Sequence, residues 1–185
     1  MKTFGRVLTA MITSFNDDGS VNIENTVAIA QHLLDHGSDG LVVCGTTGEN
    51  PTMSRESKIA LFKAIAKACG DKGTIIANVG SNDTKGSVDF VKEVSTIPGI
   101  DGLLVVVPYY NKPNQQGQYL HFKSIAEATT LPIMVYNVPG RVGTGIFPAT
   151  LARLHKEYPH ICAIKEASGN LMIASEIKRL MPGED

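Results

Sequence analysis

The sequence predicts an α/β fold, and within that class a (β/α)8 TIM barrel of which this chain supplies about the first six β/α units. Two observations lead to this prediction. Short apolar segments alternate with segments of helical spacing along the chain, and each apolar segment is a continuous run, as in parallel strands covered on both faces. A barrel of eight such units takes about 250 residues, so the 185 residues correspond to about six units.

The predicted strands are the apolar runs, each of which leads into a polar turn. Residues 41–43 read Leu-Val-Val and residues 103–107 read Leu-Leu-Val-Val-Val, without the apolar–polar alternation that is usual in antiparallel sheets. We therefore expect parallel strands at 7–13, 40–45, 74–80, 102–108, 132–138 and 162–167.

The predicted helices fill the segments between these strands, where apolar residues recur at helical intervals. Ser54 and Thr84 offer hydroxyl groups as N-caps, and Gly37 and Gly70 stand where a helix is expected to end. We expect helices at 25–36, 54–68, 84–94, 116–128, 148–156 and 171–180.

The competing architecture is an open, doubly wound sheet, which six strands would complete without missing parts. Its glycine-rich phosphate fingerprint is absent, because the first strand runs into Ser-Phe-Asn-Asp-Asp-Gly at 14–19. We therefore favour the barrel, and expect residues 1–185 to form a single barrel domain that is incomplete at its C-terminal side.

Charge and cysteine content exclude several functional classes. The chain has 17 basic and 18 acidic side chains, a balance that predicts neither nucleic acid nor a membrane surface as a partner. Three scattered cysteines predict neither a disulfide framework nor a zinc motif. No apolar stretch approaches the roughly 20 residues of a spanning helix, and no export signal is visible. We therefore expect a cytoplasmic protein with reduced thiols.

Candidate functional residues lie where the predicted strands end, because parallel strands bring their carboxyl ends to one rim. The second strand is followed by two threonine hydroxyl groups in the segment Gly-Thr-Thr-Gly-Glu at 45–49. The fourth strand is followed by two phenols, Tyr109 and Tyr110. The fifth strand carries Tyr136 and leads to Arg141. Phenols can relay protons, and an arginine can hold a carboxylate. The same residues can also be explained without a function: the 45–49 segment as an ordinary turn, the tyrosines as residues that close the core, and Arg141 as a solvated side chain.

Lys165 is the strongest candidate, because it places an ammonium group within an apolar strand at 162–167. Burial of the cation is costly. A desolvated lysine responds with a lowered pKa, and its neutral amine can then attack a carbonyl carbon. The alternative is a structural ion pair with a buried carboxylate.

Together, four segments at the strand ends resemble the dihydrodipicolinate synthase family of the pyruvate-dependent class I aldolases, over essentially the whole chain. They are Gly-Thr-Thr-Gly-Glu at 45–49, Tyr-Tyr-Asn-Lys-Pro at 109–113, Tyr-Asn-Val-Pro-Gly-Arg at 136–141 and Ile-Lys-Glu-Ala-Ser-Gly at 164–169. The resemblance implies that Lys165 forms a Schiff base with pyruvate. It implies that Tyr136 moves protons and is linked through Thr46 to Tyr110, which reaches in from a neighbouring subunit.

The same resemblance implies how the substrates are held. Thr47 and backbone amides of the turn, including that of Gly45, would bind the carboxylate of pyruvate, and Arg141 would bind that of L-aspartate 4-semialdehyde. The product belongs to lysine and diaminopimelate biosynthesis. No cofactor and no metal are implied, and a homo-oligomer, a dimer or a tetramer, is expected.

Two alternatives stay open beside this reading. Another aldolase, of the N-acetylneuraminate lyase or keto-deoxy-sugar type, would share the lysine and the tyrosine. A truncated barrel could also keep these residues without catalysing a reaction. Pro51, Arg55 and Lys58 stand where lysine-inhibited relatives carry contacts for the inhibitor, so we expect weak or absent inhibition by lysine.

Overall fold

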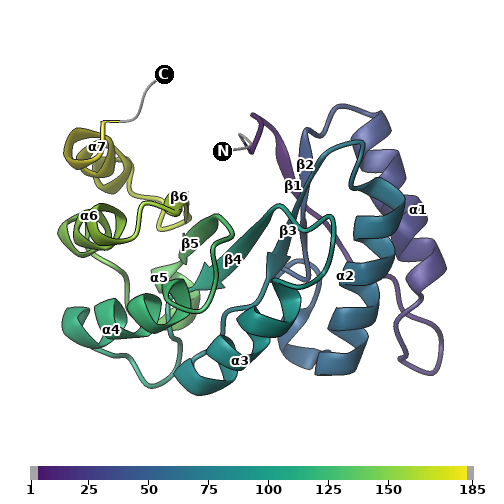
Figure 1. Cartoon of the computed structure of the whole chain (residues 1–185), viewed down its shortest axis with the longest axis horizontal. Helices are drawn as coiled ribbons and strands as arrows, with labels where there is room; N and C mark the ends of the chain where they lie inside the picture. Colours follow the sequence, from purple (N-terminus) through teal and green to yellow (C-terminus); the bar gives the residue numbers. More distant parts are fainter. Residues whose placement is uncertain (1–3, 183–185) are drawn as a thin grey trace. The chain divides into compact units, whose positions relative to one another are not determined.

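The computed structural model describes residues 4–182 (Figure 1), and these divide into two compact units. The first unit runs from residue 4 to Asn78 and includes Glu93–Leu104. The second consists of Val79–Lys92 and residues 105–182. Each unit is described by itself.

The strands of the first unit are parallel and pair in chain order. β1 (Leu8–Ala10) pairs with β2 (Gly40–Val43), β2 with β3 (Thr74–Asn78), and β3 with the first part of β4 (Gly102–Val106). Every residue of β2 and β3 is buried. This confirms that continuous apolar runs form strands that are covered on both faces.

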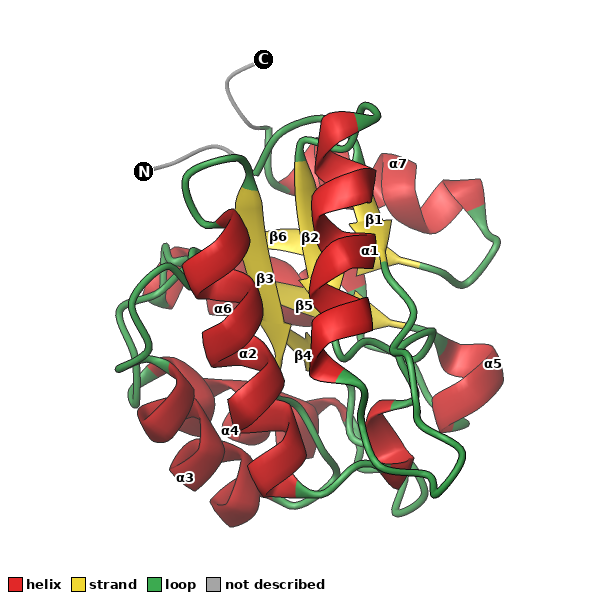
Figure 2. Cartoon of the chain, turned by 90° about the vertical axis from the view of Figure 1, so that its right-hand side faces the viewer, coloured by secondary structure: helices red, strands yellow, loops and turns green. Residues whose placement is uncertain are grey.

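The helices of the first unit are α1 (Ile23–Asp35), the short 3-10 helix η1 (Asn50–Thr52) and α2 (Arg55–Cys69). Figures 1 and 2 show α1 and α2 side by side along β2 and β3. Ser54 caps α2 as predicted, because its side chain accepts a hydrogen bond from the Ser57 amide. Gly37, with φ at 105°, follows the end of α1, where a left-handed residue is favourable.

The strands of the second unit are the end of β4, β5 (Ile133–Asn137) and β6 (Ile161–Glu166). β5 and β6 are parallel, and the Val107 amide donates to the Tyr136 carbonyl at 3.0 Å. The register shifts once, so that Ile133 lies opposite Ile161 and Met134 opposite Ala163. In order, the strands are β1-β2-β3-β4-β5-β6.

The helices of the second unit are α4 (Gln115–Ala126), α5 (Pro139–Val142), α6 (Pro148–Glu157) and α7 (Leu171–Leu180), with the first part of α3 (Thr84–Val94). The prediction that Thr84 is an N-cap is wrong. Thr84 is the first residue of α3, and its hydroxyl lies 2.8 Å from Nδ1 of the buried His121. The hydroxyl is therefore directed to another helix instead of its own amides.

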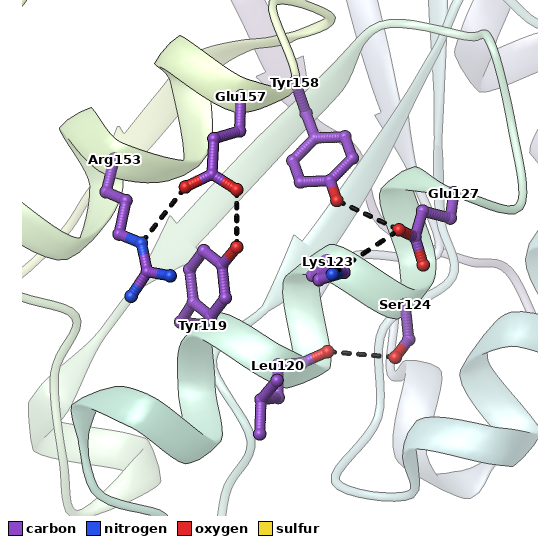
Figure 3. Close-up of polar contacts among 8 residues, drawn as sticks. All are labelled: Tyr119, Leu120, Lys123, Ser124, Glu127, Arg153, Glu157 and Tyr158. Atoms are coloured by element: carbon purple, nitrogen blue, oxygen red, sulfur yellow. Dashed lines mark hydrogen bonds and ion pairs between the residues drawn. The ribbon is translucent and has the colours of Figure 1, made fainter.

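Polar contacts join α4 to α6 in this unit (Figure 3). The Tyr119 hydroxyl donates to Glu157 at 2.6 Å, and Arg153 Cζ lies 3.7 Å from the centre of the Tyr119 ring. The Tyr158 hydroxyl donates to Glu127 at 3.0 Å. These contacts fix α6 against α4 and thereby the segments that lead into β6.

The six predicted strands and the six predicted long helices are all present, with small differences at their ends. The largest difference is in the first strand, which was expected at 7–13 and spans only Leu8–Ala10. Ile12 and Val7 are each 53% exposed, so these residues are not part of a covered strand. Over the described residues, no helix is both long and apolar enough to span a membrane.

Candidate active site

Lys165 lies near the end of β6, directly opposite Tyr136 of β5. Its Nζ atom is 4.5 Å from the centre of the Tyr136 ring. The lysine is half-buried, and this burial lowers the pKa of its amine. In the described part of the chain no carboxylate forms an ion pair with Lys165. The neighbouring Glu166 accepts hydrogen bonds from Asn137 and Ser168. The described residues therefore do not form the alternative of a structural ion pair at Lys165.

Tyr136 is held in place by its strand. It is 6% exposed, and its carbonyl accepts the amide of Val107. The phenol and the amine of Lys165 are thus presented side by side from two paired strands. A phenol next to a partly desolvated amine can deliver and receive protons while a carbonyl compound reacts at nitrogen.

A pair of polar side chains follows this couple by one residue on each strand. Asn137 Nδ2 donates to Glu166 Oε2 at 2.7 Å, and Asn137 is 1% exposed. Neither Asn137 nor Glu166 was predicted from the sequence to be part of the site. The available signal was that each directly follows a site residue at the end of an apolar strand.

Arg141 lies on α5, a single helical turn that begins at Pro139. Arg141 is exposed, and Gly143, with φ at 75°, is the C-cap that follows α5. A Cβ atom at Gly143 would lie 2.6 Å from Lys112 Cε, the far end of a flexible side chain, so the positive φ is what favours glycine at this position. The structure therefore places Arg141 on an exposed turn, in the same unit as Lys165.

Tyr110 lies in the loop after β4 and is 89% exposed. Its φ is 71°, in the left-handed region that is uncommon for residues other than glycine. Among the described residues, the Tyr110 ring is thus exposed, whereas the Tyr136 ring is buried. The predicted contact from a neighbouring subunit, through Thr46, stays a prediction.

Gly45, Thr46 and Thr47 belong to the first unit, in the turn after β2. The amides of Gly48 and Glu49 close this turn on the carbonyls of Gly45 and Thr46, each at 3.1 Å. The turn is also held from β3 and from the segment after β1, because Asn78 Nδ2 donates to the Cys44 carbonyl at 2.8 Å and Thr13 Oγ1 donates to the Gly48 carbonyl at 2.8 Å. The side chains of Thr46 and Thr47 are exposed, and so they are available to a ligand.

A second partly buried lysine lies in the first unit. Lys58 is half-buried in α2, and desolvation lowers the pKa of its amine. The nearby Cys44 thiol is buried, which raises its pKa to about 12. Among residues 4–182 no tyrosine ring lies against the Lys58 amine as Tyr136 lies against Lys165, so Lys58 serves as an internal comparison.

The structure thus brings Lys165 and Tyr136 together and places Arg141 and Tyr110 in the same unit. It places Gly45, Thr46 and Thr47 in the other unit. That all seven line one pocket stays a prediction. Among residues 4–182, no group of three or more His, Cys, Asp or Glu side chains is arranged to hold a metal ion.

Residues 3–184 match the model of the Dihydrodipicolinate synthetase family. Over 179 residues the chain is 51% identical to the 4-hydroxy-tetrahydrodipicolinate synthase of Desulforamulus reducens, an alignment that covers 97% of this chain and 60% of that relative. The enzyme of the same name from Moorella thermoacetica is 51% identical over 181 residues, which covers 98% of this chain and 61% of the relative.

Solved structures agree with these relatives. The dihydrodipicolinate synthase DapA-2 of Bacillus anthracis superposes with a TM-score of 0.93 at 42% identity, over 97% of this chain and 61% of that one. The Acinetobacter baumannii dihydrodipicolinate synthase, solved in complex with pyruvate, gives 0.93 at 35% identity, over 98% and 62%. The chain thus spans about 60% of the relatives it matches, and its six parallel strands are the first six β/α units of a (β/α)8 barrel.

Proposed function

Because the chain belongs to the Dihydrodipicolinate synthetase family, we propose that it carries the activity of a 4-hydroxy-tetrahydrodipicolinate synthase. This activity is the condensation of pyruvate with L-aspartate 4-semialdehyde through a Schiff base on Lys165. The observation that carries the proposal is the half-buried amine of Lys165, which has a lowered pKa and lies 4.5 Å from the ring of Tyr136.

The proposed reaction begins when the neutral Lys165 amine attacks the ketone carbon of pyruvate. The carbinolamine loses water and becomes an imine, and loss of a proton from the methyl carbon then gives an enamine. Tyr136 exchanges the protons of these steps. The enamine carbon attacks the aldehyde, the amino group of the second substrate attacks the imine carbon, and ring closure releases the lysine as a free amine.

The other residues would bind the charged ends of the substrates. Thr47 and the backbone of its turn, including Gly45, would hold the carboxylate of pyruvate. Arg141 would hold the carboxylate of L-aspartate 4-semialdehyde, because a guanidinium can bind a carboxylate through two hydrogen bonds. Thr46 would link Tyr136 to the Tyr110 of a neighbouring subunit, so the proposed enzyme is a homo-oligomer.

Trapping with borohydride tests the first half of this reaction. Protein incubated with pyruvate and borohydride should gain one reduced pyruvyl group on the peptide that contains Lys165. Lys165→Arg should gain none, whereas Lys58→Arg, which changes another lysine whose pKa is lowered by desolvation, should be modified like the wild type. An unmodified Lys165 peptide in folded wild-type protein would contradict the proposal.

The second substrate separates the synthase from related aldolases, which share the Schiff base. Addition of L-aspartate 4-semialdehyde to the pyruvate-loaded protein should discharge the imine and give the cyclic product. If N-acetylmannosamine or a sugar aldehyde discharges the imine and L-aspartate 4-semialdehyde does not, the chain acts as a lyase of the sugar-acid type.

A further inference from the structure

Asn137 and Glu166 form a polar bracket, by which we mean the hydrogen bond between their side chains across β5 and β6. Asn137 Nδ2 donates to Glu166 Oε2 at 2.7 Å. The two residues are register partners, one position beyond the Tyr136–Lys165 pair. Because successive side chains of a strand point to opposite faces, the bracket lies on the face of the sheet opposite to the amine and the phenol.

The bracket also holds the segments that follow both strands. The other carboxylate oxygen of Glu166, Oε1, accepts a hydrogen bond from the Ser168 amide at 2.7 Å. Asn137 Oδ1 accepts the Ile146 amide at 3.1 Å, and the Asn137 carbonyl accepts the Ala167 amide at 2.8 Å. The bracket thus connects the end of β5, the end of β6 and the far end of the 138–145 loop.

The 138–145 loop carries α5 and with it Arg141. The bond from Ile146 to Asn137 closes this loop at its base. A Cβ atom on Gly145 would lie 3.1 Å from Asn137 Oδ1, so the loop packs tightly against the asparagine. Movement of Asn137 would therefore be passed on both to the Tyr136–Lys165 pair and to the Arg141 turn.

Burial makes the bracket sensitive to substitution. Asn137 is 1% exposed, so loss of its partner would leave the buried asparagine amide without this hydrogen bond, whereas Glu166 is partly exposed. Glu166 carries a charge, and hydrogen bonds to an ionised acceptor are stronger and shorter than those between neutral groups. The arrangement therefore fixes one spacing of the two strand ends instead of allowing several.

We propose that Asn137 and Glu166 are positioning residues that set the placement of the Lys165 amine against Tyr136 and hold the Arg141 turn. The inference rests on the proposed function of Lys165. Neither residue needs to touch a substrate, since each acts through the strand and the loop that it holds.

Exchange of the two functional groups provides a sharp test. In Asn137→Asp a second carboxylate faces Glu166, and the two groups repel each other. In Glu166→Gln an NH2 group replaces one of the two accepting oxygens. This NH2 group then faces either the Asn137 side-chain NH2 or the Ser168 amide, and two donors repel each other. In the double variant Asn137→Asp with Glu166→Gln, the glutamine donates to the aspartate and accepts from Ser168, so the hydrogen-bond pattern is restored with its roles reversed.

The rate of borohydride trapping of pyruvate at Lys165 is the primary measurement, made at a temperature at which thermal melts show every variant to be folded. We expect each single variant to trap about tenfold more slowly or worse, since small misplacements of reacting groups have effects of this size. The double variant should return to within about threefold of the wild type, because its two changes compensate. Ile133→Val, at the far end of β5, lowers packing without touching the bracket and should trap at the wild-type rate.

Competitive acetylation of Lys165 and Lys58, followed by mass spectrometry as a function of pH, provides a measurement that does not need pyruvate. In the single variants the pH dependence of Lys165 acetylation should move towards that of an ordinary lysine, and in the double variant it should return to that of the wild type. The pH dependence of Lys58 acetylation should stay unchanged in all variants. The inference would be overturned if the single variants trapped pyruvate as fast as the wild type. It would also be overturned if the double variant trapped pyruvate as slowly as either single variant. If the wild type does not trap pyruvate but the acetylation profiles shift as expected, the proposed function fails and the bracket stands.

Discussion

Among residues 4–182, desolvation lowers the pKa of two lysines, Lys58 and Lys165, and their surroundings distinguish them. Lys58 lies on a helix beside a buried thiol, whereas Lys165 lies on a strand with the Tyr136 ring 4.5 Å from its amine. Both amines have lowered pKa values because of burial. Desolvation alone makes an amine more nucleophilic, but the reaction proposed here also needs a nearby group that exchanges protons.

Variants of Tyr136 and Arg141 should separate the two halves of the reaction. Tyr136→Phe should slow both pyruvate trapping and product formation, by about a hundredfold or more, because a proton-transfer group typically contributes that much. Arg141→Ala should leave trapping intact and raise the KM for L-aspartate 4-semialdehyde. Both should melt near the wild-type temperature, and wild-type rates in both variants would show that the assigned roles are wrong.

His121 should make the stability of the protein depend on pH. Burial lowers the pKa of His121 from 6.5 to about 4, so the folded protein holds it neutral while the unfolded chain takes up a proton below pH 6.5. Its contribution is therefore complete above pH 6.5 and is lost as the pH falls towards 4, by roughly 3 kcal/mol in total. Urea unfolding at pH 7 and pH 4.5 should show a smaller difference for His121→Gln than for the wild type.

Exposed His36 serves as the comparison for this measurement. His36→Gln removes a histidine that packs on His32 at the end of α1. The difference in the free energy of unfolding between the two pH values should match that of the wild type. An equal pH response in His121→Gln and the wild type would mean that the buried ring is not held neutral.

The helices depend on local signals and on contacts between them to different degrees. α4 and α6 are joined by the Tyr119–Glu157 and Tyr158–Glu127 hydrogen bonds, which cross between helices (Figure 3). α2 instead begins with a cap that lies wholly within its own sequence, since Ser54 accepts from Ser57 at 3.1 Å. A signal of this local kind can be read from sequence, whereas a contact between helices cannot.

Removal of the Ser54 cap should destabilise the chain measurably. Ser54→Ala leaves an amide at the start of α2 without its acceptor, which typically costs about 1 kcal/mol. Thermal unfolding should move down by about 2–4 °C, the shift that such a loss gives in a protein of this size. Ser175→Ala, at an exposed position within α7, should leave the melting temperature almost unchanged, and an equal loss in both variants would argue against the cap.

At the scale of the molecule, the second unit leaves apolar surface uncovered around β6. A groove of about 860 Å³ lies between α6, β6 and α7, and Lys165, Tyr136 and Arg141 are not among the residues that line it. Ile164 and Ile177 face this groove, and none of the described residues of α7 is buried. Apolar surface of this kind favours association.

We expect the chain to self-associate through this groove. Ile164→Lys places a charge in it and should lower the association seen by sedimentation velocity across a range of protein concentrations. Leu120→Lys makes the same change at a half-exposed site on α4 and should leave association unchanged. Equal effects of both substitutions would point to general solubility instead of the groove.

Much of the fold could be predicted from sequence because its signals are local and repeated. The strands at Leu41 and Leu103 are read from continuous apolar runs, and Ser54 from its place before a helical pattern. α5 was missed because a single turn, Pro139–Val142, is too short to give a periodicity. Thr84 was assigned wrongly because the sequence does not reveal that its hydroxyl faces His121 instead of its own helix.

By itself, the sequence determined the β/α order of the chain, the placement of Lys165 and Tyr136 near the ends of their strands, and that of Arg141 in the segment after β5, because periodicity and parallel pairing dictate all three. The tertiary structure decided the surroundings of these side chains. The spacing of amine and phenol, the shift in register near Ile133 and the bond from Asn137 to Glu166 join residues that are far apart in the chain, by 29 positions in the last case. Such contacts depend on the packing of whole strands against each other, which no local pattern records.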